Sequence, residues 1–272
     1  MTVVGVTMVR DEADVIEHVI RHMTTQVDAI IVMDNRSVDG TTDILHSLES
    51  DTIAIVDDPT VGYEQSKKMT TLAHTARDWY EADWIVPFDA DEIWYAPNGS
   101  ISRFLDAYHN DHVVEANLFD HVATDLDDPN EINPIARLLW RRSYAAPLPK
   151  VAVRWDRSLK IGMGNHDASY HFTPRHARDR MAIRHFPYRS ADQIVRKIRN
   201  GAEAYAATEL PDHYGAHWRQ WGAILERDGE DAIVDLFRKW HWRENPSQEI
   251  NIDGDISPPL RFDPACAVSP IC

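Results

Sequence analysis

Apolar and polar stretches alternate along the first 90 residues in a way that predicts strands separated by helices. Residues 11–25 place apolar side chains three and four positions apart, which is the spacing of a helix that packs on one face. Shorter runs rich in β-branched residues have the length and composition of buried strands. The expected strands are residues 2–9, 29–33, 52–56 and 83–88, and the other expected helices are residues 41–48 and 63–80. This alternation predicts a mostly parallel sheet with helices on both faces.

The second half of the chain has a less regular pattern. Ser190 and Gln193 have the spacing of a capping box, and they begin a helix with an apolar face. Residues 124–134 are rich in turn-forming residues and predict a loop. The other expected helices are residues 100–108, 213–226 and 230–242, and the strand candidates are residues 113–122, 137–140, 150–155, 159–163 and 181–186. Residues 243–272 contain five prolines and predict an extended tail.

These elements predict an α/β fold with a single Rossmann-like sheet. A chain of 272 residues is long enough to bury the core of one domain and still carry an extension. We expect the sheet domain to occupy residues 1–205. Residues 206–272 are expected to form a helical C-terminal extension and tail that pack on it.

Polar residues follow each of the four N-terminal strands. They are Arg10-Asp11-Glu12, Asp34-Asn35, Asp57-Asp58 and Asp89-x-Asp91. Ligands of parallel α/β sheets bind at the carboxyl ends of the strands. Residues two apart on a strand point to the same side, so Asp89 and Asp91 are expected to present two carboxylates to one spot. Hard divalent cations prefer oxygen ligands, and the pair therefore predicts a metal site; the alternative is a polar strand end or an Asx turn.

Charge is unevenly distributed along the chain. The net charge of −16 argues against general affinity for nucleic acid. Residues 137–199 hold 15 Lys or Arg and four acids, a net charge of +11, whereas the other residues hold 13 Lys or Arg and 40 acids, a net charge of −27. A basic segment in an acidic protein predicts a local anion site, with ordinary surface patchiness as the alternative.

Targeting and redox signals are few. Cys266 and Cys272 lie within the last seven residues, so the sequence suggests neither a disulfide framework nor a cysteine-based zinc site. No apolar run approaches the ~18 residues of a membrane span. The first residues have the pattern of a strand and not of a signal peptide. A cytoplasmic protein without a transmembrane segment is therefore expected.

Four blocks of sequence, in this order, resemble the family 2 glycosyltransferases of the GT-A fold. They read VGVTMVRDEADVIEHVIRH, IIVMDNRSVDGTTDIL, ADWIVPFDADEIW and IRHFPYRSADQIVRKIRNG. Asp11 departs from the family pattern, in which asparagine is usual at this position. The Gln-x-x-Arg-Trp motif of the processive branch is absent, so the resemblance implies the soluble, non-processive branch.

The resemblance implies a hexosyltransferase that moves one sugar from a nucleotide-diphosphate sugar, with a UDP-sugar favoured, to an acceptor. It further implies dependence on Mn²⁺ or Mg²⁺ and inversion at the anomeric carbon. The sequence leaves the acceptor open as a saccharide, a protein or a small molecule. A nucleic-acid acceptor is less favoured, because the overall charge would repel a duplex.

The resemblance also suggests the metal ligands. Asp91 would bind the cation directly, and Asp89 would contact the ribose or a metal-bound water. His166 lies in the glycine-rich segment 162–167, where similar enzymes often place a histidine. Imidazole suits Mn²⁺ better than Mg²⁺, so His166 is the third expected ligand. The alternative is a histidine on a surface loop.

The expected nucleotide site combines the first strand ends with the basic segment. Asp34 would accept a hydrogen bond from uracil, as the matching aspartates of similar enzymes do. Helix N-termini favour anions, so residues around the start of the helix at Ser190 are expected to bind the diphosphate. Residues assigned to the base and ribose are Thr7, Arg10 and Glu12, and Lys68 (or its neighbour Lys67) is expected to reach the nucleotide as well. Those assigned to the diphosphate are His185, Arg189 and Lys197.

A carboxylate is expected to deprotonate the acceptor hydroxyl, but the family's usual Glu-Asp pair is not evident. Asp167 is the favoured base, followed by Glu92. Asp120 and Asp125 are further candidates, and a retaining mechanism assisted by the leaving phosphate stays open.

Two other classes of function fit the same pattern. One is a metal-dependent nucleotidyltransferase or phosphoesterase, although the chain lacks an N-terminal glycine-rich phosphate loop. The other is a non-catalytic protein that binds nucleotide sugars. The presence of Asp89, Asp91 and His166 argues against loss of catalysis.

Overall fold

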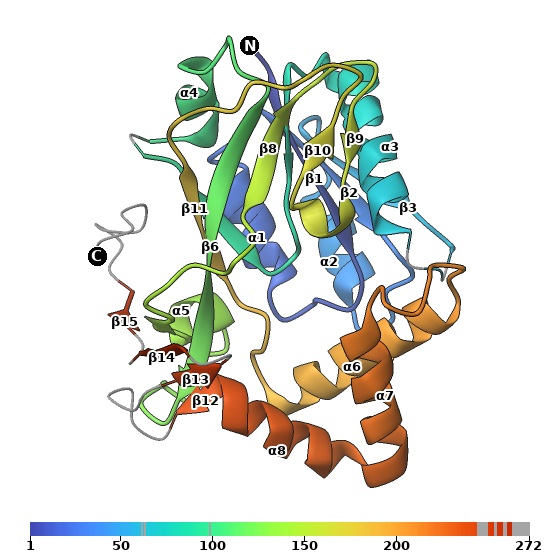
Figure 1. Cartoon of the computed structure of the whole chain (residues 1–272), viewed down its shortest axis with the longest axis vertical. Coiled ribbons are helices and arrows are strands. Elements are labelled where there is room, and N and C mark those ends of the chain that lie inside the picture. The colour runs from blue at the N-terminus through green and yellow to red at the C-terminus, as the bar shows by residue number, and fades with distance from the viewer. Residues whose placement is uncertain are drawn as a thin grey trace.

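Four parallel strands from the N-terminal part of the chain form one half of the central sheet (Figure 1). The computed structural model describes residues 1–60, 62, 64–97, 99–243, 250–252, 255–257 and 260–262. The strands lie in the order β4-β1-β2-β3, and all three pairings are parallel. Their bounds are β1 Val3–Val9, β2 Ala29–Asp34, β3 Ile53–Asp57 and β4 Trp84–Pro87. Each lies within one residue of its expected range.

Helices cover both faces of these strands. On one face, residues of α1, α2 and α4 share an apolar cluster with Val3 and Val9 of β1, and on the other face residues of α3 share a second cluster with Val4 and Val6. The two clusters follow from the alternation of side chains along β1. The helices are α1 Ile16–Met23, α2 Thr41–Leu48, α3 Gln65–Tyr80 and α4 Ile101–Asp106. The expected start of α3 at residue 63 lies outside the described residues.

The other half of the sheet is mixed. β8 pairs antiparallel with β4, β6 pairs antiparallel with β8, and β11 pairs parallel with β6 and antiparallel with β5. Its strands are β5 Glu92–Tyr95, β6 Val113–Thr124, β7 Trp140–Arg141, β8 Lys150–Arg154, β11 Met181–His185, β12 Trp242–Arg243 and β15 Leu260–Arg261. Two separate two-stranded sheets consist of β9 Lys160–Ile161 with β10 Ala168–Ser169, and of β13 Ile250–Ile252 with β14 Asp255–Ser257. The predicted α/β class, a mostly parallel sheet flanked by helices, is confirmed.

Three helices lie at the end of the sheet where β1 and β2 finish (Figure 1). Ile194 and Ile198 of α6 pack with Ile233 and Phe237 of α8 to form a small separate core. The helices are α6 Ala191–Ala206, α7 Ala216–Asp228 and α8 Glu230–His241. Among the described residues, no helix is both long enough and apolar enough to cross a membrane.

Several local predictions were wrong. The first helix begins at Ile16 and not at residue 11, because Asp11 adopts a positive φ of 56° and the chain turns before the helix starts. The expected strand 137–140 is replaced by the short helix α5 Pro134–Arg137, which Asn133 caps by accepting a hydrogen bond from Ile135 N, followed by β7. β5 was not predicted. Most of the predicted tail, and both cysteines, lie outside the described residues.

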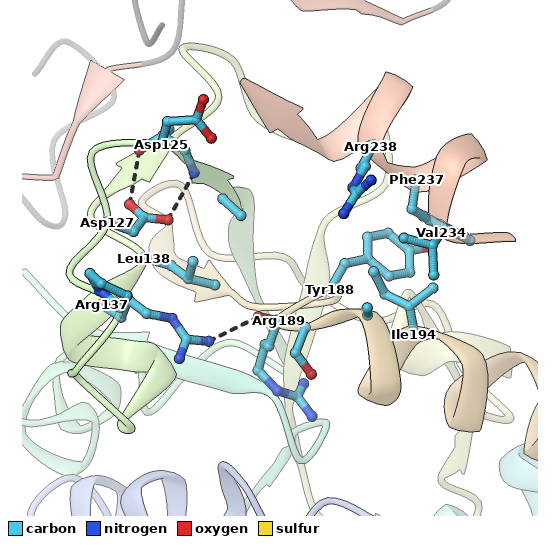
Figure 2. Close-up of a pocket in the computed structure, with 15 residues that line it drawn as sticks. Asp125, Asp127, Arg137, Leu138, Tyr188, Arg189, Ile194, Val234, Phe237 and Arg238 are labelled. Atoms are coloured by element: carbon cyan, nitrogen blue, oxygen red, sulfur yellow. Dashed lines mark hydrogen bonds between the residues drawn. The ribbon is translucent and has the colours of Figure 1, made fainter. Parts of the chain in front are cut away.

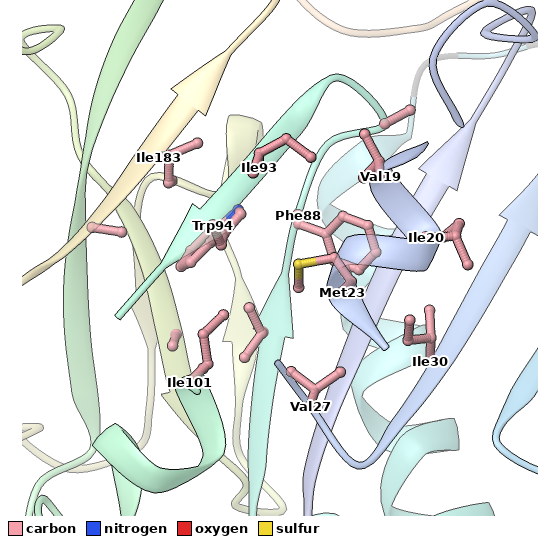
Figure 3. Close-up of a cluster of buried hydrophobic side chains, with 14 of the residues drawn as sticks. Val19, Ile20, Met23, Val27, Ile30, Phe88, Ile93, Trp94, Ile101 and Ile183 are labelled. Carbon is pink, nitrogen blue, oxygen red and sulfur yellow. The ribbon is translucent and has the colours of Figure 1, made fainter. Parts of the chain in front are cut away.

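The core between α1 and the sheet centres on large apolar side chains (Figure 3). Phe88 and Trp94 are fully buried there, and Phe88 faces Met23 of α1. A Cβ atom at Gly5 of β1 would lie 3.0 Å from the Phe88 ring, so the glycine makes room for the phenylalanine. Phe88 therefore fixes the position of the chain just before the acidic turn that follows β4.

Phe88→Ala is expected to lower the free energy of unfolding by about 3–5 kcal/mol, because it removes a buried ring and leaves a cavity. Urea denaturation measures this value. Trp79→Ala serves as the control, because Trp79 lies on α3 with 56% of its surface exposed and should cost far less. Equal losses in the two variants would contradict this description of the core.

Candidate active site

The two aspartates of the Asp-x-Asp motif lie in a turn. β4 ends at Pro87, and Glu92 N donates to Asp89 O at 3.1 Å as the chain turns into β5. The alternation of side chains along a strand therefore does not apply to the pair. Asp89 contacts Lys150 Nζ at 2.5 Å, whereas Asp91 contacts Lys197 Nζ at 2.6 Å. Each carboxylate is paired with a different ammonium group.

Asp91 is surrounded by cationic groups. Besides Lys197, its carboxylate lies 3.6 Å from His185 Nε2 and 3.7 Å from Arg189 Nη1. Burial raises the pKa of Asp91, but Lys197, His185 and Arg189 lower it by more, so its pKa is well below the usual value. The carboxylate is ionised, and the structure brings together four of the predicted site residues.

Arg189 ties the start of α6 to the loop after β1. Its guanidinium donates two hydrogen bonds to Asp14, at 2.7 and 2.9 Å, and one to Glu12. The remaining nitrogen of the guanidinium, Nη1, donates to Phe186 O at 2.9 Å. Burial alone would lower the pKa of Arg189, but Glu12 and Asp14 raise it above its ordinary value. Arg189 is thus a buried, permanently charged group.

Three titratable residues lie at one level of the sheet. His185 of β11 is in register with Glu92 of β5 on one side and with Asp120 of β6 on the other. His185 Nδ1 lies 2.7 Å from Asp120 Oδ1. Glu92 is fully buried between Lys150 Nζ and Trp94 Nε1, both at 3.0 Å. Asp120 retains an 18% exposed side chain, so it is the more accessible of the two acids.

One side of α6 lies across the carboxyl ends of β1, β2 and β4. Four residues on this side of α6 contact charged side chains that follow the strands. The contacts are Arg196 with Asp39 at 3.6 Å, Lys197 with Asp91 at 2.6 Å, Asn200 with Asp11 at 2.7 Å, and Glu203 with Arg10. The predicted cap of this helix is confirmed, because Ser190 Oγ accepts a hydrogen bond from Gln193 N at 3.2 Å.

The residues expected to bind the nucleotide line the same strand ends. Asp34 accepts hydrogen bonds from Ser37 N at 3.1 Å and from Thr42 Oγ1 at 2.5 Å, so it also orders its own loop. Lys68 is buried and pairs with Asp58 at 2.6 Å. In the part of the chain that the structure describes, Thr7 Oγ1 and two nitrogens of Arg10 are buried without a hydrogen-bond partner. A ligand that supplied polar atoms there would satisfy them.

The hairpin β9–β10 brings a different residue to Asp89 than the one predicted. His166 Nδ1 lies 2.9 Å from Pro149 O, and burial together with Lys150 lowers the pKa of His166. Asn165 Nδ2 donates to Asp89 Oδ1 at 3.0 Å, while Asn165 Oδ1 has no partner among the described residues. Asp167 is exposed on the hairpin. Its role as the base stays a prediction.

The acids of the site have suitable oxygen ligands for a divalent cation, but they are already paired with lysines. Within the described part of the chain, no three His, Cys, Asp or Glu side chains form a ready metal site. Asp89 and Asp91 have the oxygen ligands that Mn²⁺ and Mg²⁺ accept, but lysines already neutralise them. A cation bound by Asp89 and Asp91 would therefore have to replace the ammonium groups of Lys150 and Lys197.

Sequence reasoning missed Lys150, Asn165 and Asp14. Lys150 begins the buried strand β8 (KVAVR), and only 4% of its side chain is exposed. A lysine at the start of an apolar strand could have predicted a buried ion pair, because a buried lysine needs an acidic partner. Asn165 has a positive φ of 59°, which the sequence does not reveal. Asp14 gave no signal, because its partner Arg189 is distant in the chain.

Comparisons with known proteins give a coarse likeness of fold. No protein-family model matches the sequence, and no curated protein matches it. TarS 1-349 from S. aureus, solved in complex with UDP-GlcNAc, is 10% identical with a TM-score of 0.43, over 89% of this chain and 78% of that one. HddC from Yersinia pseudotuberculosis is 9% identical with a TM-score of 0.39, over 68% and 90% of the two chains. Overlaps at this level say nothing about activity.

Arg189→Met is expected to lower the free energy of unfolding by about 3–5 kcal/mol, because it leaves the buried carboxylate of Glu12 and the half-buried carboxylate of Asp14 without their partner. Chemical denaturation monitored by circular dichroism measures the loss. Arg199→Met is the matched control. Arg199 also forms an ion pair, with Glu230 at 2.8 Å, but both side chains are exposed, so its loss should cost no more than about 1 kcal/mol.

Proposed function

We propose that this protein transfers a single sugar from a nucleotide-diphosphate sugar, with a UDP-sugar favoured, to an acceptor hydroxyl. The observation that supports this most is the surrounding of Asp91, where Lys197, His185 and Arg189 meet a carboxylate at the end of a parallel sheet. Cations and acids side by side suit a diphosphate that carries a divalent cation. The resemblance of four sequence blocks to family 2 glycosyltransferases points to the same reaction.

The leaving diphosphate gains negative charge as its bond to the sugar breaks. In the proposed reaction, Lys197 turns from Asp91 to the diphosphate, and its side chain is 23% exposed, which leaves it room to move. Arg189 stays in place and keeps the local potential positive. Mn²⁺ or Mg²⁺, held by Asp89 and Asp91 when bound, would act as a Lewis acid on the phosphate oxygens.

We propose Asp120 as the base, in preference to Asp167. Asp120 lies within the cluster and is oriented by His185 and by Arg142, whose Nε is 3.7 Å away. The acceptor oxygen attacks the anomeric carbon, and a new C–O bond forms while the C–O bond to the diphosphate breaks. The diphosphate leaves with the electron pair, and Asp120 takes the hydroxyl proton. This single displacement inverts the anomeric configuration.

Thermal denaturation with Mn²⁺ and UDP tests the donor site. Mn²⁺ alone should change the melting temperature little, because lysines already occupy both aspartates. Mn²⁺ and UDP together should stabilise the protein by about 2.7 kcal/mol at a hundredfold excess over Kd, a rise of several degrees. Asp91→Asn should abolish the joint effect, and Asp106→Asn, an exposed aspartate at the end of α4, should keep it.

A screen of nucleotide sugars for slow hydrolysis separates the proposed function from its rivals, because it requires no acceptor. Release of UDP from a UDP-sugar supports the transferase. Turnover of nucleoside triphosphates or simple phosphoesters instead would favour a nucleotidyltransferase or a phosphoesterase. If no nucleoside diphosphate changed the melting temperature of the protein, the proposal would be rejected.

Asp120→Asn is expected to lower the rate of donor hydrolysis by about 10²–10⁴-fold, because an amide cannot take the proton. Stabilisation by Mn²⁺ and UDP should persist, since asparagine oxygen still accepts the hydrogen bond from His185. Asp167→Asn is measured in parallel. Loss of hydrolysis in Asp167→Asn, with Asp120→Asn still active, would assign the base to Asp167.

A further inference from the structure

A pocket of about 580 Å³ lies beside the charged cluster, because Arg189, which contacts Asp91, is also one of the residues that line it (Figure 2). Its walls are the loop after β6, α5, the start of α6 and one side of α8. The lining is mainly apolar, and its large apolar members include Leu138, Tyr188, Ile194, Val234 and Phe237. A volume of this size suits a small organic molecule.

Tyr188 connects this pocket to the cluster around Asp91. Its ring packs on Phe237 with the centroids 4.4 Å apart, and Lys197 Nζ lies 6.0 Å from the centroid of the same ring. Burial, together with Asp120 and Asp91, raises the pKa of Tyr188 to about 12, although Lys197 opposes the shift. Tyr188 therefore lines the pocket and also lies beside Lys197 of the charged cluster.

The polar groups of the pocket are largely engaged. Asp127 accepts hydrogen bonds from Thr124 N at 2.8 Å and from Thr124 Oγ1 at 2.9 Å. Arg137 donates to the backbone oxygens of Glu131 at 3.0 Å and Arg189 at 2.9 Å. Arg238 points into the opening (Figure 2). A saccharide needs many polar partners, so this lining suits an apolar body with one reactive hydroxyl better.

We propose that the pocket binds the acceptor, and that the acceptor is a hydroxyl-bearing compound with an apolar aromatic body. This inference rests on the proposed function, which it extends by naming the class of acceptor. The aromatic body would pack against Tyr188 and Phe237, as aromatic rings do in offset or tilted pairs. Its hydroxyl would face Asp120 and the anomeric carbon of the donor.

Isothermal titration of the full chain with 2-naphthol, in the presence of UDP and Mn²⁺, tests this inference. Wild-type protein should bind it, and Val234→Trp should bind it at least about tenfold more weakly, because the indole fills the pocket. Asp231→Trp adds the same side chain at an exposed position of α8 outside the pocket and should bind as the wild type does. Methyl β-glucoside is the saccharide probe and should bind more weakly than 2-naphthol.

A second variant covers the case in which Val234→Trp fails to fold. Ala191→Phe narrows the pocket from an exposed position at the start of α6 and should also weaken binding. The inference would be overturned if wild-type protein did not bind 2-naphthol, or if it bound methyl β-glucoside more tightly than 2-naphthol. Equal binding of 2-naphthol by the wild type, Val234→Trp and Ala191→Phe would also overturn it. Failure of the proposed function looks different, because wild-type protein would then show no stabilisation by UDP with Mn²⁺.

Discussion

The buried guanidinium of Arg189 is the interaction on which the candidate site depends. Its side chain is fully enclosed, and it joins Asp14 and Glu12 after β1, the neighbourhood of Asp91 after β4, and the start of α6. A buried charge of this kind is tolerated only when its partners are placed to neutralise it. The same contact therefore fixes the loop after β1, the turn after β4 and the first turn of α6 relative to one another.

Residues of the basic segment 137–199 form ion pairs with acids from the rest of the chain. Lys150, Arg189 and Lys197 come from the segment with a net charge of +11, whereas Asp89 and Asp91 come from the acidic remainder. Without a ligand, each group neutralises another, so the site holds neither a large excess of acid nor of base. In the proposed function, a diphosphate with a divalent cation would bring both signs to this site at once.

The sequence predicted the fold better than the contacts of the site. The four parallel strands and the capped helix at Ser190 follow from local apolar patterns, and each lies close to its expected range. The sequence pattern at Asp89 and Asp91 predicts the end of a strand, whereas the structure has a turn there, because two acids two positions apart fit either description. Asn165 reaches Asp89 through a backbone conformation with positive φ, which no spacing of residues indicates.

By itself, the sequence determined that acids would gather at the carboxyl ends of a parallel sheet, and it predicted an anion site in a basic segment. Those properties depend on local periodicity and on chain topology. Only the tertiary structure decided that Lys197 pairs with Asp91 and Lys150 with Asp89, that Asp120 joins His185, and that a mainly apolar pocket lies behind Tyr188. These contacts join residues distant in the chain, and their geometry is fixed by packing between elements, which local sequence patterns do not encode.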